Sequence, residues 1–389
     1  GKSLVGIEVP NSKTALVGLR TMLEEEEYAK SKWFLPLAIG RDVAGAGIFG
    51  GLEKMPHLLI AGATGTGKSV VINTILLSLL YKHSPDVLKL ILVDPKRVEL
   101  SLYNDIPHLI TPVITDTKKV LGALKWTVGE MDRRYDMLSK SGSRDIDSYN
   151  AKITSKNEPL MPFIVIVIDE LADLMVSYGR DVEAAIVRLA QMSRAVGIHL
   201  ILSTQRPSVN IITGTIKANI PARIALQVAS QIDSRTILDA PGAENLLGAG
   251  DMLFQSADMA KPHRIQTAFI SENEVKEIAS FIRKHNEPST DDISITSQGN
   301  DASPNAIFSA TMDDEDNDEL LGDAQQTVED AGKASTSLLQ RKLRIGYSRA
   351  ARLMDLLEQR GIIGPQDGAR PRAVLTGPRA GQTLDDESA

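Results

Sequence analysis

Residues 57–80 read HLLIAGATGTGKSVVINTILLSLL, and this stretch decides the fold of the chain. It begins with a short apolar run typical of a buried strand and ends with a long apolar helical pattern. Between them GATGTGKS, residues 62–69, matches the spacing G-x-x-x-x-G-K-[ST]. Glycines let the backbone curl so that successive N–H groups point at phosphate oxygens, and the helix start adds its positive end. The stretch therefore predicts a strand, a phosphate-binding loop and a helix; the alternative is a chance glycine-rich turn.

The loop implies ATP and Mg²⁺ as ligands. Lys68 would reach the β- and γ-phosphates, and the Ser69 hydroxyl would ligate the metal ion. The predicted nucleotide-binding residues are Gly62, Ala63, Thr64, Gly65, Thr66, Gly67, Lys68, Ser69 and Val70.

A second apolar run, FIVIVIDE at residues 163–170, ends in two acids. A strand of this kind delivers Asp169 beside the phosphate loop, where it can hold Mg²⁺ through water. Glu170 faces the other way on an extended chain and can act on the attacking water. The alternative is a capping acid at a strand end. Downstream of a phosphate loop, the pair favours hydrolysis over phosphoryl transfer to a metabolite.

Two further strand ends carry polar groups. ILSTQRP, residues 201–207, supplies Gln205, which could sense a γ-phosphate or lie at a solvent-exposed strand end. VDPKRVEL, residues 93–100, places Asp94 and Lys96 after a buried run. These two are expected either beside the nucleotide or in ion pairs at the surface.

The remaining pattern predicts an α/β fold with a mainly parallel sheet, because short apolar β-rich runs alternate with helical patterns. An acidic helical stretch and a strand-like segment are also expected near the N-terminus, at 16–32 and 34–41. The expected buried strands are residues 57–61, 89–93, 163–168, 198–203 and 222–228, and the expected helices are 68–81, 117–138 and 181–196.

Composition narrows the class of protein. The chain has 389 residues, of which 42% are hydrophobic and 24% charged, as in ordinary globular proteins. It has no cysteine, which excludes a disulfide framework and a thiolate metal site. No apolar run approaches the ~20 residues needed to cross a bilayer. Because it begins with glycine, we expect it to be a piece of a longer protein.

Charge is distributed unevenly around a net value of −7. Residues 287–316 hold eight acids and no Lys or Arg, which predicts a flexible linker. Residues 335–372 hold eight Lys or Arg against three acids, as expected of a phosphate-binding surface. Helical patterns at 319–331, 337–343 and 348–360, followed by a strand-like piece at 370–375, predict a winged helix-turn-helix.

Several motifs together resemble the FtsK/SpoIIIE DNA translocases over roughly residues 5–285. The stretch LLQRKLRIGYSRAARLMDLLEQRGII, residues 338–363, resembles that family's winged-helix module, gamma. The motifs of the first region are AGATGTGKS, LILVDPKRVEL, VIDELADLM, SRAVGIHLILSTQRPSVNIITGTIKANIPARIALQV, QIDSRTILD and GAGDMLF.

The resemblance implies a RecA-like ATPase that forms hexameric rings around double-stranded DNA and moves chromosomes at cell division. Arg194 would complete a neighbour's site, unless it is a cation neutralising a helix C-terminus. The expected domains are an N-terminal α-like subdomain at 1–50, a RecA-like P-loop ATPase at 51–286, a linker at 287–316, a winged helix at 317–378 and a disordered tail at 379–389.

A motor that runs along any sequence should touch phosphates, whereas the gamma-like helix would place side chains at guanine edges. Each residue could instead be a solvated surface charge, and the gamma-like helix could bind protein. The predicted DNA-contacting residues are Arg206, Lys217 and Arg235 on the motor, and Ser348, Arg349, Arg352, Arg370 and Arg372 on the gamma-like module.

The resemblance further implies a site-specific recombinase and division proteins as partners. It places the parent protein at the cytoplasmic face of the cell membrane at the division site, held by an upstream anchor. Two rivals remain open: a conjugative or secretion-type coupling ATPase, and a DNA-bound regulatory switch. The gamma-like module argues against the first rival, and the paired acids argue against the second.

Overall fold

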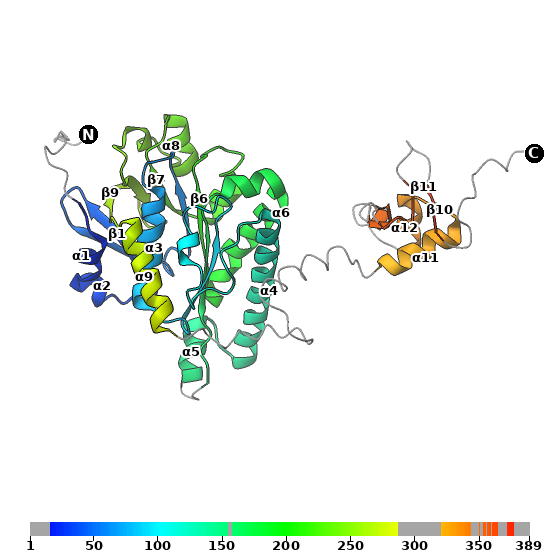
Figure 1. Cartoon of the computed structure of the whole chain (residues 1–389), viewed down its shortest axis with the longest axis horizontal. Coiled ribbons are helices and arrows are strands. Elements are labelled where there is room, and N and C mark those ends of the chain that lie inside the picture. The colour runs from blue at the N-terminus through cyan, green and yellow to red at the C-terminus, as the bar shows by residue number, and fades with distance from the viewer. Residues whose placement is uncertain are drawn as a thin grey trace, which may run out of the picture. The chain divides into compact units, whose positions relative to one another are not determined.

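The computed structural model describes residues 16–154, 158–286, 320–343, 350, 353–354, 356–358, 360–364 and 372–376. The chain divides into two compact units, Gly1–Asn305 and Ala306–Ala389, which are coloured blue to yellow and orange to red in Figure 1. Residues 1–15, the expected linker at 287–316 and the expected tail at 379–389 lie outside the described residues.

The first unit is built on a nine-stranded sheet with the order β2-β1-β9-β8-β7-β3-β6-β5-β4. The strands from β7 to β4 in this order are parallel, and the strands from β2 to β8 are antiparallel, as is the β7–β8 pair. The predicted α/β fold with its parallel core is thus confirmed. The strands are β1 (Pro36–Asp42), β2 (Gly47–Gly51), β3 (His57–Ala61), β4 (Leu88–Val93), β5 (Phe163–Ile168), β6 (Ile198–Thr204), β7 (Ala222–Leu226), β8 (Asp251–Gln255) and β9 (His263–Thr267).

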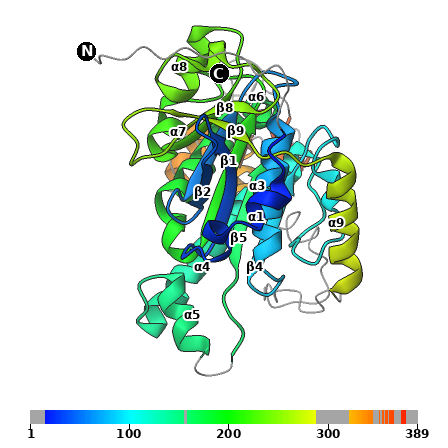
Figure 2. The same ribbon diagram turned by 90° about the vertical axis from the view of Figure 1, so that its left-hand side faces the viewer.

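The parallel strands are buried along their whole length, because helices cover both faces of the sheet. Figures 1 and 2 show α3 on one face and the packed pair α4 and α6 on the other. The helices of this unit are α1 (Leu19–Leu23), α2 (Glu26–Ala29), α3 (Lys68–Lys82), α4 (Thr117–Ser141), α5 (Ile146–Thr154), α6 (Leu171–Met192), α7 (Gly214–Asn219), α8 (Gln231–Leu238) and α9 (Glu272–His285), with 3₁₀ turns η1 (Ser101–Tyr103), η2 (Ser193–Val196) and η3 (Ala243–Asn245).

Helix α6 begins ten residues before the predicted start at 181. Glu170 caps its first turn by accepting a hydrogen bond from the Ala172 backbone N–H, so the helix follows β5 directly. Its backbone is non-helical at Tyr178 (φ −140°, ψ 35°), just before Gly179. This break interrupts the apolar periodicity, which explains why the sequence pattern indicates only the second half of the helix.

The N-terminal segment joins the main sheet. Strand β1 lies between β2 and β9 and corresponds to the strand expected at 34–41. The Tyr28 hydroxyl on α2 donates to the Ser78 carbonyl of α3 at 2.6 Å, which fastens the acidic helical stretch to the face of the sheet.

The second unit has its own apolar core. Helix α11 (Leu321–Ala331) and helix α12 (Thr336–Leu343) are followed by described helical positions at 350, 353–354 and 356–358. Strand β10 (Lys333–Ala334) pairs antiparallel with β11 (Arg372–Ala373). The core residues include Leu321, Val328, Leu339, Leu353, Leu357, Ile363 and Val374. Among the described residues, no helix has the length and apolar character of a membrane span.

Candidate functional site

The phosphate-type loop joins β3 to α3. Gly65 and Gly67 adopt positive φ values of 79° and 109°, and a Cβ on Gly67 would lie 2.7 Å from the Gly250 backbone nitrogen. The loop is tied down at its base, where Ala63 N–H donates to the Gln227 carbonyl at 2.9 Å. Helix α3 starts at Lys68 without a side-chain cap, so the N–H groups of its first turn remain available to an anion. The loop and the first turn of α3 together have the form of a phosphate-binding site for a nucleoside triphosphate.

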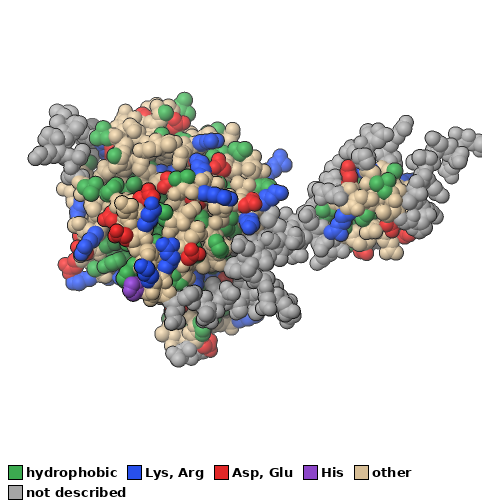
Figure 3. All heavy atoms as spheres, viewed as in Figure 1, with side chains coloured by type: hydrophobic (Ala, Val, Ile, Leu, Met, Phe, Trp, Pro, Cys, Tyr) green, Lys and Arg blue, Asp and Glu red, His purple; other side chains and the backbone are tan. Residues whose placement is uncertain are grey.

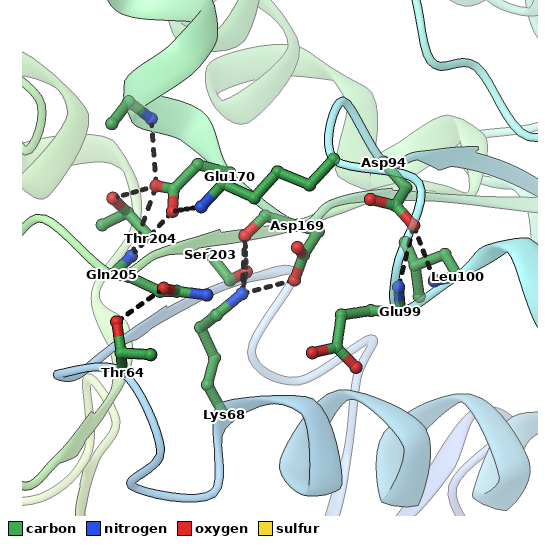
Figure 4. A network of polar contacts seen from close by, with 12 residues as sticks. Thr64, Lys68, Asp94, Glu99, Leu100, Asp169, Glu170, Ser203, Thr204 and Gln205 are labelled. Atoms are coloured by element: carbon green, nitrogen blue, oxygen red, sulfur yellow. Dashed lines mark hydrogen bonds and ion pairs between the residues drawn. The ribbon is translucent and has the colours of Figure 1, made fainter. Parts of the chain in front are cut away.

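Three parallel strands bring polar groups to the same edge of the sheet as this loop. Strand β3 lies beside β6, with Ala61 opposite Thr204, and β6 lies beside β5. Because parallel strands end at a common edge, Asp169 and Glu170 after β5 and Gln205 after β6 meet Lys68 there. Figure 4 shows these side chains gathered above the start of α3.

Lys68 and Asp169 form a buried ion pair, with 4% and 1% of their side chains exposed. The Lys68 ammonium also donates to the Asp169 carbonyl at 2.8 Å and to the Ser203 hydroxyl at 3.3 Å. Burial raises the pKa of the Asp169 carboxyl above its ordinary value, and the Lys68 charge opposes that rise. Lys68, the predicted phosphate-binding lysine, is therefore paired with Asp169, the predicted metal ligand.

Glu170 is fully buried and accepts hydrogen bonds from several directions. The Thr204 hydroxyl donates at 2.6 Å, the Gln205 backbone N–H at 3.3 Å and the Lys96 ammonium at 3.0 Å. Burial by itself would raise the pKa of Glu170, but the bonds from Thr204 and Lys96 bring it below the ordinary value. The carboxyl is therefore ionised at neutral pH.

Gln205 connects the loop to this carboxylate. Its side-chain oxygen accepts a hydrogen bond from the Thr64 hydroxyl at 2.8 Å, while its backbone N–H donates to Glu170. A shift of the loop at Thr64 would be felt by Gln205, and through its backbone by Glu170. Such a link is what a γ-phosphate sensor requires.

Ser69 follows Lys68 in the first turn of α3 and is half-buried. The described residues contain no cluster of three or more His, Cys, Asp or Glu side chains suited to a metal ion. A cage of that kind is not needed for Mg²⁺ at a nucleotide, because the ion takes one or two protein ligands, waters and phosphate oxygens. The Ser69 hydroxyl and the Asp169 carboxylate supply the kind of oxygen ligand that this requirement names.

Known proteins match both units of the chain. The family model described as FtsK/SpoIIIE family matches residues 18–209, and the model described as Ftsk gamma domain matches residues 315–377. The chain is 55% identical over 378 residues to the DNA translocase FtsK of Clostridium tetani, covering 96% of this chain and 50% of that protein. It is 54% identical over 375 residues to the DNA translocase FtsK of Caldanaerobacter subterraneus, covering 96% of this chain and 51% of that protein.

The chain belongs to the FtsK/SpoIIIE family. It spans about half the length of the curated relatives it matches. Among solved structures, the pCW3 conjugation coupling protein TcpA is similar, with a TM-score of 0.58 and 32% identity over 67% of this chain and 72% of that one. The type VII secretion ATPase EccC of Thermomonospora curvata has a TM-score of 0.60 and 25% identity over 71% of this chain and 35% of that one. The RecA-like ATPase fold and the winged-helix class of the second unit follow from these matches.

Within this family fold, Arg194 lies far from its own chain's loop. It is exposed in the η2 turn, which precedes β6, whereas the loop faces the other end of that strand. Strand β6 is seven residues long, a span of about 20 Å. Arg194 therefore does not reach the site of its own chain, and a role in nucleotide chemistry requires a second copy.

The predicted DNA-contacting residues of the motor differ in availability. Arg206 and Arg235 are exposed, the first after β6 and the second on α8. Lys217 is half-buried and pairs with Asp239 at 2.7 Å, and Arg223 contacts the same carboxylate. Contact between Lys217 and a phosphate would have to compete with this ion pair.

Of the predicted DNA-contacting residues on the gamma-like module, Arg372 is the one that the structure describes. It lies on β11 and pairs with Glu358 at 2.5 Å, with 12% of its side chain exposed. Ser348, Arg349, Arg352 and Arg370 lie outside the described residues. Their roles in DNA contact remain predictions.

The sequence predicted Lys96 either beside the nucleotide or in an ion pair at the surface. The structure shows it in an ion pair with Glu170. The loop that follows β4 is closed by Asp94, whose Oδ2 accepts hydrogen bonds from the backbone N–H groups of Glu99 and Leu100 at 3.0 and 2.9 Å. Lys96 is thus an ion-pair partner and also a member of the site. Thr64 and Ser203 were named as loop and strand residues, and no pattern signals the contacts they make here.

Proposed function

We propose that this chain is an ATP-hydrolysing motor that moves double-stranded DNA. The observation that carries the proposal is the meeting of Lys68, Asp169 and Glu170 at one edge of the parallel sheet, directly above the helix that follows the loop. The family relatives named DNA translocase FtsK support DNA as the substrate. The TcpA structure, which was solved with ATPγS, supports a nucleotide as the ligand.

In the proposed mechanism, Lys68 leaves Asp169 for the β- and γ-phosphates of ATP. Asp169 and Ser69 would hold Mg²⁺, whose charge would neutralise that of the phosphate oxygens. Glu170 takes a proton from the attacking water as general base. Gln205 reports the presence of the γ-phosphate through its bond to Thr64. The Gly62–Val70 segment supplies backbone donors to the phosphates.

The proposed assembly is a homohexameric ring around DNA, in which Arg194 of one copy stabilises charge in the site of the next. Its exposure in η2, about 20 Å from its own loop by the length of β6, supports action between copies. Arg206, Lys217 and Arg235 would face duplex phosphates in the channel. Ser348, Arg349, Arg352, Arg370 and Arg372 would orient the motor on chromosomal DNA.

The parent protein would act at the division site from the cytoplasmic face of the membrane, held by a segment upstream of this chain. A site-specific recombinase and division proteins would be its partners. Similarity to TcpA and EccC leaves conjugative or secretory coupling as the second candidate. The gamma-domain match at residues 315–377 favours chromosome translocation over that candidate.

Steady-state ATP turnover against duplex DNA of increasing length tests the proposed function. We expect turnover of the wild type to rise steeply with duplex length and to weaken with added salt, because phosphate contacts release counterions. Glu170→Gln should lose about 10²- to 10⁴-fold in turnover while still binding nucleotide, as expected for removal of a general base. Turnover that does not respond to duplex DNA would contradict the proposed motor.

A further inference from the structure

The loop that follows β4 has a fixed shape and carries Lys96 toward the site. Asp94 is fully buried and holds the Glu99 and Leu100 N–H groups, while the Leu100 side chain is buried in the core. Arg97 turns the chain with a positive φ of 58°. These contacts fix where the Lys96 side chain leaves the backbone. At its far end the Lys96 ammonium donates a hydrogen bond to the Glu170 carboxylate, 3.0 Å from Oε2.

Glu170 has its acceptor capacity filled in this arrangement. A carboxylate offers about four lone-pair sites. Oε1 accepts from the Ala172 backbone N–H and the Thr204 hydroxyl, Oε2 accepts from the Lys96 ammonium, and the Gln205 backbone N–H lies 3.3 Å from both oxygens and is shared between them. A general base needs a free lone pair within hydrogen-bond reach of the water. One of these donors therefore has to leave before Glu170 can act.

The donors differ in how easily they leave. The two backbone groups belong to the first turn of α6 and to the residue directly after β6, and Thr204 is fully buried. The Lys96 side chain is 38% exposed and sits on a flexible stem. Water can replace Glu170 as its partner, so breaking this contact costs little compared with moving the others.

We propose that Lys96 is a positioning residue that holds Glu170 at rest and releases it for ATP hydrolysis. This inference rests on the proposed function, because it requires Glu170 to act on water. The ammonium lies 3.0 Å from Glu170 Oε2 and competes with water for that oxygen. ATP turnover without DNA is thereby restrained until the flexible Lys96 side chain leaves the Glu170 carboxylate.

Lys96→Met tests this role by removing the charge and keeping the stem. Turnover without DNA should rise about three- to fivefold, the factor that a part-exposed ion pair supports. The rate on long duplex DNA should stay near that of the wild type, so the stimulation ratio falls. Lys96→Arg keeps a cation in reach and should restore the wild-type ratio. The matched control is Lys276→Met, which breaks the exposed Lys276–Glu272 pair on α9 and should change neither rate.

If Lys96→Met lowered turnover by the same factor with and without DNA, the proposal would be overturned, because Lys96 would then assist the chemistry. A wild type without DNA-stimulated turnover defeats the proposed function and this inference with it. If DNA stimulates the wild type and Lys96→Met has the same stimulation ratio, the inference about Lys96 fails and the proposed function stands.

A double-mutant cycle on thermal unfolding gives a readout that needs no turnover. Lys96→Met, Glu170→Gln and the double variant, measured without nucleotide, should show non-additive shifts of Tm. Additive shifts would mean that the two side chains do not interact at rest, and would also overturn the proposal.

Discussion

Lys68 and Asp169 form a buried ion pair, in which each side chain keeps its charge because the other neutralises it. The Asp169 carboxylate is 1% exposed, and the Lys68 ammonium is the charged group in contact with it. A buried charge without a partner is strongly unfavourable, and loss of one partner costs more than the pair contributes. In the proposed function ATP separates these residues, so phosphate and metal charge must replace the pairing that each loses.

Lys68→Met should therefore destabilise the protein as well as abolish nucleotide binding. We expect a loss of about 3 kcal/mol in the free energy of unfolding at pH 8. The pKa of Asp169, already raised by burial, would rise further without the ammonium. The folded variant then binds a proton more readily than the unfolded chain, so its stability relative to wild type recovers as the pH falls. Urea unfolding at pH 8 and pH 5.5 measures this, and the deficit should be smaller at pH 5.5.

The companion variant is Lys68→Met combined with Asp169→Asn. It has no buried charge to strand, so its stability should exceed that of Lys68→Met alone and should differ from wild type by nearly the same amount at both pH values. A deficit for Lys68→Met that does not change with pH would contradict the assignment to Asp169.

Sequence patterns could predict Lys68, Asp169, Glu170 and Gln205 as neighbours because each follows a recognisable parallel strand. They could not predict which polar groups saturate each other. The pairing of Lys217 with Asp239 joins α7 to the end of α8, across the whole of β7 and α8. The contact of Lys96 with Glu170 spans 74 positions. Such pairs depend on the folded geometry of turns, which carries no periodic signal.

At the scale of elements, Arg134 joins helix α4 to the turn that leads into β6. Its side chain is 1% exposed, pairs with Glu130 at 2.8 Å and donates to the Val196 carbonyl at 2.8 Å. Arg133, one residue earlier, binds the same glutamate but is 54% exposed. The two arginines share a partner and differ in burial, which makes them a matched pair.

Arg134→Met should cost about 3 kcal/mol in the free energy of unfolding, because the Val196 carbonyl is left unpaired inside the protein. Arg133→Met should cost less than about 1 kcal/mol, as for other part-exposed ion pairs. Urea unfolding of both variants at pH 7.5 measures the difference. Equal losses would show that the contact between α4 and the η2 turn adds nothing beyond the shared pair with Glu130.

Elements were predictable where burial shapes the sequence directly. Strands β3, β5 and β6 are buried throughout and have mainly apolar sequences. Strand β9, HRIQT, is only partly buried, and its polar residues gave no strand signal. Strands β2 and β8 were missed as well: β2 is mostly half-buried, and β8 is a short antiparallel strand. In the antiparallel half of the sheet, β1 was therefore predicted from the sequence, whereas β2, β8 and β9 emerged from the structure.

At the scale of the molecule, the described residues of the two units form separate apolar clusters. One cluster joins the sheet to α1, α3 and α9, with members from Leu19 to Ile282. The other lies within Leu321–Val374 and shares no residue with the first. The acidic stretch at 287–316, predicted to be a linker, lies between them in sequence. Folding cooperativity follows contiguous cores, so two transitions are expected for one chain.

Differential scanning calorimetry of the whole chain should resolve two unfolding transitions, of which the larger belongs to the first unit, because enthalpy scales with the number of ordered residues. Adding ATP and Mg²⁺ should raise the Tm of the larger transition and leave the smaller in place, since a ligand stabilises the unit that binds it. A short duplex DNA that carries the sequence read by the gamma unit should raise the Tm of the smaller transition. Glu170→Gln serves as a control, because it should keep the shift with ATP without consuming it. A single transition, shifted as a whole by either ligand, would show that the two cores unfold as one and that the gamma unit is energetically coupled to the motor.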